Sequence, residues 1–268
     1  MKTQRKEKVS KMIVVASYKD DLSFLENKWL QDIPRTIYEK GKGDNWKQQI
    51  LDDSKLTMKD FIEVDGDTVY LPNIGQDGQV FLHHIVENYD NLSDINVFIA
   101  GDALEDLRHR DNTPAYYYNM ISSFDKNSPQ YVNVAETTGN FPLRGFHYRF
   151  FNDRIRDKWK DLFEEECPTK FEPAIDSTFM ATKEAILSHP KSFYEKALSW
   201  IDERCYREDH WKMEWQGDVV SVLAPSKKNL EKFPHKSPKH FEFPACGFFE
   251  HSYQRMFDPN FRQCIKIK

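Results

Sequence analysis

The first hundred residues alternate between short apolar runs and amphipathic stretches, and this alternation limits the possible folds more than any other feature. Residues 12–17 (MIVVAS) and 95–100 (INVFIA) are continuous apolar runs next to polar clusters, as expected of strands buried on both faces. Residues 21–30 and 78–89 place apolar side chains at helical spacing. Strands alternating with helices predict an α/β fold, a central sheet with helices on its faces.

Further elements are predicted along the rest of the chain. RTIYEKGKG (35–43) predicts a strand that ends in a glycine-containing loop, and FIEVDGDTVYL (61–71) predicts a hairpin with Asp65-Gly66 in its turn. Later patterns predict helices at residues 153–166, 183–187, 191–204 and 248–257 and a short strand or edge segment at residues 177–181. The tyrosine-rich stretch 114–127 has no clear period.

Length and composition narrow the class of protein. The chain has 268 residues, no internal repeat and no clean linker, so we expect a basic tail over residues 1–11 and a single domain over residues 12–268. The balance of 38 Lys+Arg against 43 Asp+Glu argues against a protein that coats duplex DNA. No apolar run approaches the roughly 20 residues of a transmembrane helix.

The four cysteines have no CxxC or zinc-type spacing, so they predict free thiols in a reducing cytoplasm. We therefore expect a cytoplasmic protein without a nucleic-acid partner or a transmembrane segment.

Polar residues follow two of the predicted strands. Asp102 lies at the carboxyl end of residues 95–100, where open α/β sheets bind ligands, and its carboxylate could hold a divalent cation on two phosphates. Capping of a helix near Ala103 is the structural alternative. After the first strand, Tyr18 could stack on a base and Asp20 could accept hydrogen bonds from a base or ribose. Alternatively, Asp20 or Asp21 caps the next helix.

The turn before residues 78–89 is a second candidate. It contains Asn73, Gly75 and Asp77 ahead of a predicted helix, whose free N–H groups could hold a phosphate. The turn lacks the GK[ST] ending of a Walker loop. Asp77 could hydrogen-bond a sugar hydroxyl or simply compensate the helix dipole.

Glu250 is the candidate general base. It lies at the border of the apolar stripe in GFFEHSYQRMF, where partial burial can raise the pKa of a carboxylate toward neutrality. The alternative is a surface glutamate paired with Arg255 or with a lysine. The adjacent His83 and His84 point about 100° apart on a helix, so we interpret them as structural rather than as ligands of one metal ion.

Several segments, in order, resemble an uncharacterised family with glycosyltransferase-like features. They are VVASYKDDLSFL, IYEKGKG, LPNIGQDGQVFLHHIVENYDNL, VFIAGD, FMATKEAILSHPKSFYEKALSWI and FFEHSYQRMF. They are similar to the family's "NxGxExxxYLxHI", "FAVSRERI" and "ExxWxxxF" blocks, among others, and span most of residues 13–257. Asp77 replaces the family's usual Glu, Tyr253 replaces its Trp, and Ala100-Gly101-Asp102 stands where a DxD would be expected.

The resemblance implies a GT-A type, Rossmann-like sheet. It implies a nucleotide-sugar-binding half over residues 12–110 and an acceptor and catalytic half over residues 111–268. By resemblance, the donor-binding residues are Tyr18, Asp20, Asn73, Gly75 and Asp102, and the catalytic carboxylates are Glu250 and Asp77. Asp102 would hold Mn²⁺ or Mg²⁺, and Glu250 would deprotonate the acceptor hydroxyl.

We therefore expect a glycosyltransferase that moves a sugar from a nucleotide-diphosphate sugar to a glycan or another hydroxyl acceptor, with inversion at the anomeric carbon. One alternative is a metal-dependent phosphoester hydrolase that uses Asp102, Asp106 and histidines. Another is a non-catalytic carbohydrate-binding protein that uses the aromatic middle region.

Overall fold

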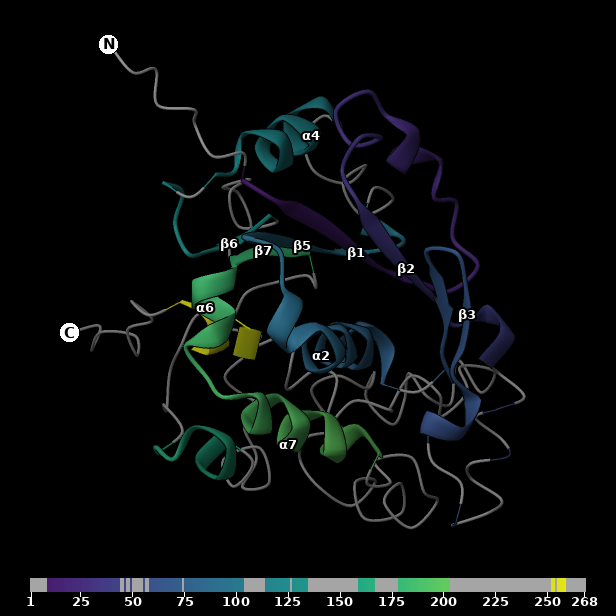
Figure 1. The fold of residues 1–268 in the computed structure, drawn as a ribbon, viewed down its shortest axis with the longest axis vertical. Helices are drawn as coiled ribbons and strands as arrows, with labels where there is room; N and C mark the ends of the chain where they lie inside the picture. Colours follow the sequence, from purple (N-terminus) through teal and green to yellow (C-terminus); the bar gives the residue numbers. More distant parts are fainter. Residues whose placement is uncertain are drawn as a thin grey trace, which may run out of the picture.

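The computed structural model of the chain is built around one mixed sheet (Figure 1). It describes residues 9–43, 58–73, 75–103, 114–125, 127–134, 159–166, 178–202, 252–253 and 255–258, and the single positions 46, 49 and 55. The strands are β1 (Lys11–Ser17), β2 (Arg35–Glu39), β3 (Glu63–Asp65), β4 (Thr68–Tyr70), β5 (Ile95–Ala100), β6 (Tyr131–Asn133) and β7 (Phe179–Thr182). The prediction of an α/β sheet is therefore confirmed.

The seven strands lie in the order β3-β4-β2-β1-β5-β7-β6. Strands β1, β2, β4 and β5 are parallel to one another, whereas β3 pairs antiparallel with β4 and β7 pairs antiparallel with β5 and β6. From β1 the chain moves outward through β2 to the hairpin and then returns to place β5 on the other side of β1. Strands from both halves of the chain thus share one sheet.

Helices cover both faces of the sheet (Figure 1). The α-helices are α2 (Gln76–Asn88), α4 (Pro114–Ser123), α6 (Lys183–Leu187) and α7 (Lys191–Asp202), and the 3₁₀ helices are η1 (Ser23–Glu26), η2 (Gly41–Gly43), η3 (Met58–Phe61) and η4 (Tyr89–Asn91). On one face α2 and α7 pack over Val14, Ala16 and Phe98, and on the other α4 and η1 pack over Ile13 and Val15. Successive side chains of β1 therefore enter different hydrophobic cores, which explains its unbroken apolar sequence.

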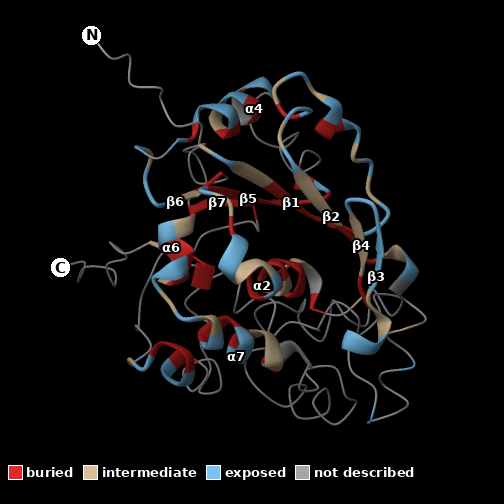
Figure 2. Ribbon diagram, viewed as in Figure 1, coloured by how far each residue is buried: buried red, intermediate tan, exposed pale blue. Residues whose placement is uncertain are grey.

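Figure 2 shows that buried residues are concentrated in the central strands and in α2, whereas the outer hairpin β3–β4 is more exposed. Aromatic rings fill the α2 face. The ring of Phe179 on β7 lies 4.7 Å from that of Phe98, 5.7 Å from that of Phe81 and 4.6 Å from that of Tyr253 (centroid distances). This cluster joins α2, two strands and the segment near residue 253 into one core.

At the level of elements one prediction is wrong, and of the two alternatives for residues 177–181 the short strand is confirmed. Residues 21–30 form only the short 3₁₀ helix η1, because Asn27 adopts an extended conformation that ends the helix. Leu25 and Leu30 are nevertheless buried, so the apolar spacing correctly indicated the side chains that face the core. The possible edge segment at residues 177–181 is the interior strand β7, which pairs with β5 and β6.

Two elements were not predicted from the sequence. Helix α4 lies in the tyrosine-rich stretch that showed no period, and β6 is only three residues long. Only residues 159–166 of the predicted helix 153–166 are described, and Trp159, Leu162 and Phe163 are buried there as expected.

Candidate functional site at the carboxyl edge of the sheet

The turns after four parallel strands meet at one edge of the sheet, which we call the carboxyl edge. They begin at Tyr18 after β1, Lys40 after β2, Leu71 after β4 and Gly101 after β5. Strands β2 and β5 flank β1, and the chain direction across the sheet reverses between β1 and β5. Open α/β sheets bind ligands outside the carboxyl ends of the strands at such a switch point.

Three of the predicted site residues gather at this switch point. The backbone N–H of Tyr18 donates to Asp20 Oδ2 at 2.8 Å, which directs the Asp20 side chain toward the turn after β5. There it packs against Gly101, where an added Cβ would lie 2.1 Å from Asp20 Oδ2. Asp102, the next residue, is exposed, and the Tyr18 side chain is 45% exposed. Tyr18, Asp20 and Asp102 thus lie in two adjoining turns of the carboxyl edge, where Tyr18 and Asp102 are exposed and Asp20 is half-buried.

The neighbouring residues Asp20 and Asp21 make different contacts in the turn after β1. Asp21 Oδ1 accepts a hydrogen bond from the backbone N–H of Ser23 at the start of η1, and this bond holds the pKa of Asp21 below its usual value. Asp20 instead faces the turn after β5. Asp21 therefore closes a local turn ahead of η1, whose N-cap is Leu22 without a side-chain cap bond, and Asp20 remains a candidate for ligand binding.

Asn73, Gly75 and Asp77 also lie at the carboxyl edge, since they connect β4 to α2. Gly75 precedes α2 with φ +69°, a left-handed conformation that glycine adopts without strain. Asp77 lies in the first turn of α2, where a carboxylate also stabilises the helix dipole. The sequence therefore placed these residues at the correct edge of the sheet.

Glu250 and Asp106 lie outside the described residues, so their predicted roles remain predictions. Part of the segment after Glu250 is described: Tyr253 is buried, with its ring 4.6 Å from that of Phe179. Arg255 pairs with Glu165, through Nε–Oε1 at 2.8 Å and Nη2–Oε2 at 3.1 Å. This pairing occupies the arginine that had been considered as a partner for Glu250.

A glutamate that the sequence analysis missed connects two turns of this edge. Glu39, the last residue of β2, accepts hydrogen bonds from the Ser17 hydroxyl (Oε2, 2.8 Å) and from the backbone N–H of Lys19 (Oε1, 3.2 Å) and Gly41 (Oε1). The EKGKG sequence offered one signal, a carboxylate followed by glycines directly after a strand. Its partners on β1 could not be identified without the strand pairing.

Two carboxylates lie in the turns after β1 and β5 at the carboxyl edge. Asp20 and Asp102 supply hard carboxylate oxygens, the ligand type that Mg²⁺ and Mn²⁺ prefer. Within the described ranges, no group of three or more His, Cys, Asp or Glu side chains could hold a metal ion.

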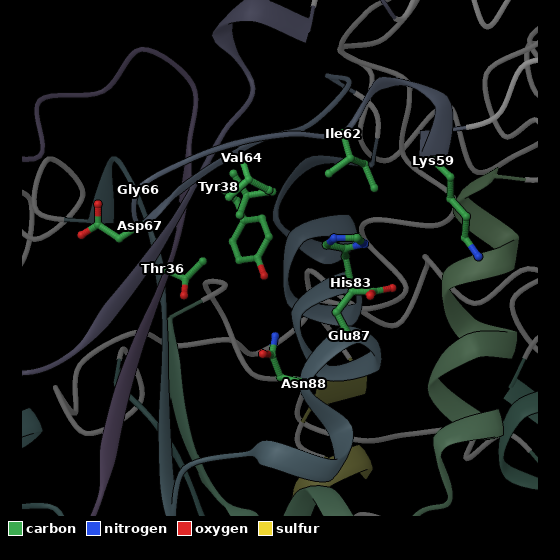
Figure 3. Close-up of a pocket in the computed structure, with 11 residues that line it drawn as sticks. Thr36, Tyr38, Lys59, Ile62, Val64, Gly66, Asp67, His83, Glu87 and Asn88 are labelled. Carbon is green, nitrogen blue, oxygen red and sulfur yellow. The ribbon is translucent and has the colours of Figure 1, made fainter.

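A groove of about 650 Å³ lies elsewhere, between α2 and the outer strands (Figure 3). Its lining residues come from five elements or their ends: Thr36, Tyr38, Lys59, Ile62, Val64, Gly66, Asp67, Val69, His83, Glu87 and Asn88. Tyr38, Val69 and Val64 are register partners across β2, β4 and β3, and Val64 is 69% exposed. The groove exists because the sheet extends beyond the helices that cover this face.

The groove contains a hydrogen-bonded aromatic pair at its base. Tyr38 Oη lies 3.0 Å from His84 Nδ1, and in Figure 3 the Tyr38 hydroxyl points toward Asn88. Burial lowers the pKa of His84 to about 4, with a smaller contribution from His83, and burial raises the pKa of the Tyr38 hydroxyl. His84 is therefore a neutral core histidine at pH 7, as the sequence analysis predicted.

Comparison with known proteins identifies a family but no characterised relative. A family model described as "Protein of unknown function (DUF3431)" matches residues 12–217, well over half of the chain. No curated protein and no solved structure gives a significant match. In the described part of the chain, no helix is both long enough and apolar enough to cross a membrane.

Proposed function

The chain belongs to the DUF3431 family, and we propose that it is a glycosyltransferase of the GT-A type. In this proposal it moves a sugar from a nucleotide-diphosphate sugar to the hydroxyl of a glycan or another acceptor. The observation that carries the proposal is the packing of Asp20 against Gly101, directly before Asp102, at the switch point of the sheet. This packing joins the turns after β1 and β5 where an open sheet binds nucleotides.

The charges at this edge support a metal-bound diphosphate rather than a bare one. Two carboxylates, Asp20 and Asp102, would repel the diphosphate of the donor in the absence of a cation. Asp102 would hold Mn²⁺ or Mg²⁺, and the ion would supply the positive charge that stabilises the leaving diphosphate. Asp102 serves this role because it is exposed and directly follows β5.

The remaining residues orient the donor and the acceptor. Tyr18 provides an exposed ring for the base, Asp20 accepts hydrogen bonds from the base or ribose, and the Asn73–Asp77 turn contacts the ribose or the donor sugar. Glu250 takes the proton of the acceptor hydroxyl. At the same time the acceptor oxygen bonds to the anomeric carbon, and the bond from that carbon to the diphosphate oxygen breaks. A base on the face opposite the leaving group gives inversion.

A thermal-shift screen of nucleotide-diphosphate sugars, with and without Mn²⁺, tests the proposal. We expect at least one donor to raise Tm in the presence of Mn²⁺ and to support transfer to an acceptor, and Asp102→Asn to remove the Mn²⁺ effect. Glu250→Gln should abolish turnover and leave the donor-induced shift in Tm unchanged. If no donor raises Tm under either condition, the proposal is wrong.

A non-catalytic carbohydrate-binding role is the second candidate, and the groove beside α2 favours it. Its volume of about 650 Å³ lies within the usual range of ligand pockets, and its lining combines apolar side chains such as Ile62 and Val69 with polar ones such as Thr36 and Asn88. Saccharide binding that depends on Thr36 and Asn88, without any acceptor-dependent turnover, would support this role over the first. Hydrolysis of nucleotides or phosphomonoesters without an acceptor would instead support a metal-dependent phosphoester hydrolase.

The proposal also includes a cytoplasmic location, supported by four cysteines without the spacing of a metal site or a CxxC pair.

A further inference from the structure

Glu39 connects two turns of the carboxyl edge through one carboxylate. Its Oε2 accepts a hydrogen bond from the hydroxyl of Ser17, and its Oε1 accepts from the backbone N–H of Lys19 and of Gly41. Ser17 is almost fully buried at the end of β1. The carboxylate therefore ties the end of β1 and the turn after it to the turn after β2.

The backbone around Glu39 is shaped to allow these bonds. An added Cβ at Gly41 would lie 2.6 Å from Glu39 Oε1 and 2.6 Å from Lys19 Cγ, so only glycine permits this close approach. Lys19 has φ +62°, a left-handed conformation that is unfavourable for a residue with a Cβ. Because the Lys19 N–H donates to Glu39, the carboxylate helps to hold this unfavourable conformation.

The conformation of Lys19 determines the position of its neighbours. Lys19 separates Tyr18 from Asp20, and the hydrogen bond from the Tyr18 N–H to Asp20 Oδ2 spans it. The same Asp20 side chain packs against Gly101 in the turn after β5. A chain of contacts thus leads from Glu39 through Lys19 to Asp20 and on to the turn that carries Asp102.

We propose that Glu39 is a positioning residue for the ligand site at the carboxyl edge, because its hydrogen bonds to Ser17, Lys19 and Gly41 hold Tyr18 and Asp20 in place. The part of this inference that concerns nucleotide-sugar binding rests on the proposed function. In this inference Glu39 acts through its hydrogen bonds within the protein and needs no contact with the ligand. It acts through the backbone of the turn after β1.

The test compares Glu39→Gln with the control Glu26→Gln. The Glu39→Gln amide keeps the size of the side chain and one acceptor oxygen, but it removes the negative charge that strengthens the hydrogen bonds from the Lys19 and Gly41 N–H groups. Glu26 is an exposed acid whose side chain contacts Arg35, and Glu26→Gln changes the net charge equally. Amide hydrogen exchange is measured residue by residue in the ligand-free protein, and donor affinity and Tm are measured in parallel.

In Glu39→Gln we expect the amides of Lys19 and Gly41 to exchange at least tenfold faster, while the amides of β5 keep their wild-type rates. We expect donor affinity to fall at least tenfold with little change in Tm, and Glu26→Gln to behave as wild type. Glu39→Asp, which restores the charge on a shorter side chain, should recover part of the affinity.

Unchanged exchange at Lys19 and Gly41 in Glu39→Gln would overturn the inference. Faster exchange throughout β1 and β5 together with a large fall in Tm would also overturn it, because Glu39 would then stabilise the whole sheet. If the wild-type protein binds no nucleotide sugar but Lys19 and Gly41 still exchange faster in Glu39→Gln, the glycosyltransferase proposal fails and the positioning role stands.

Discussion

At the scale of single residues, the candidate site depends on two close approaches of side chains to glycine backbone. Asp20 lies against Gly101, and Glu39 lies against Gly41. Because glycine has no side chain, the residue types alone could not indicate either contact. Both bring the turns at the carboxyl edge closer together than any other residue would allow.

Gly101→Ala tests the first of these contacts. The new methyl group would lie 2.1 Å from Asp20 Oδ2 and 2.7 Å from Cγ, so the Asp20 side chain must move. We expect donor affinity to fall at least tenfold, measured by calorimetry, with a stability loss of about 1–3 kcal/mol.

Gly66→Ala is the matched control for that experiment. An added Cβ at Gly66 meets nothing within 4 Å, but the residue has φ +63°. The substitution should cost about 1 kcal/mol of stability through backbone strain alone and leave donor affinity unchanged. Equal affinity of the two variants would mean that Asp20 does not contribute to binding.

The buried His84 predicts a pH dependence of stability. Burial lowers the pKa of folded His84 to about 4, below the ordinary histidine value of 6.5, so the unfolded chain binds a proton first as the pH falls. Protonation of this histidine therefore does not affect the free energy of unfolding above about pH 6.5. Between pH 6.5 and pH 4 the free energy of unfolding falls, and the loss is about 2 kcal/mol at pH 5. Urea denaturation of wild type and His84→Gln at pH 7 and pH 5 measures it. An equal loss in both proteins would show that His84 does not cause the dependence.

At the scale of elements, the sequence predicted those whose signal is local. Strands β1, β2 and β5, the hairpin and α2 all lie where apolar runs, a glycine turn or a helical stripe indicated. Helix α4 and strand β6 were missed because one lacked a clear period and the other is too short to show one. The position of β7 inside the sheet depends on pairing with distant strands, which the local periodicity of the sequence does not show.

Substitution of Phe179 tests how β7 packs against α2 and β5. Its fully buried ring contacts rings from α2, β5 and the segment near Tyr253. We expect Phe179→Ala to cost about 3–5 kcal/mol, measured by urea denaturation, because it leaves a cavity that joins three elements. Val64→Ala on the exposed edge strand should cost less than about 0.5 kcal/mol. A loss below about 1 kcal/mol in Phe179→Ala would contradict the proposed packing.

At the scale of the whole molecule, the sheet brings distant parts of the sequence to one edge. Tyr18 and Asp102 lie just beyond the carboxyl ends of β1 and β5, so their placement there followed from recognising the strands, and Asp77 lies in the first turn of α2, after the loop that follows β4. The role of Glu39 and the groove beside α2 could not be predicted from the sequence. The first depends on strand order, and the second depends on how far the sheet extends beyond its helices.

The measurement that tests the central claim most directly is the hydrogen-exchange footprint of a saturating nucleotide-diphosphate sugar with Mn²⁺. The account predicts slower exchange at Tyr18–Asp20 and Gly101–Asp102, with unchanged exchange at Thr36 and Asn88 in the groove. Slower exchange at the groove residues alone, or unchanged exchange at all of these positions, would contradict the account.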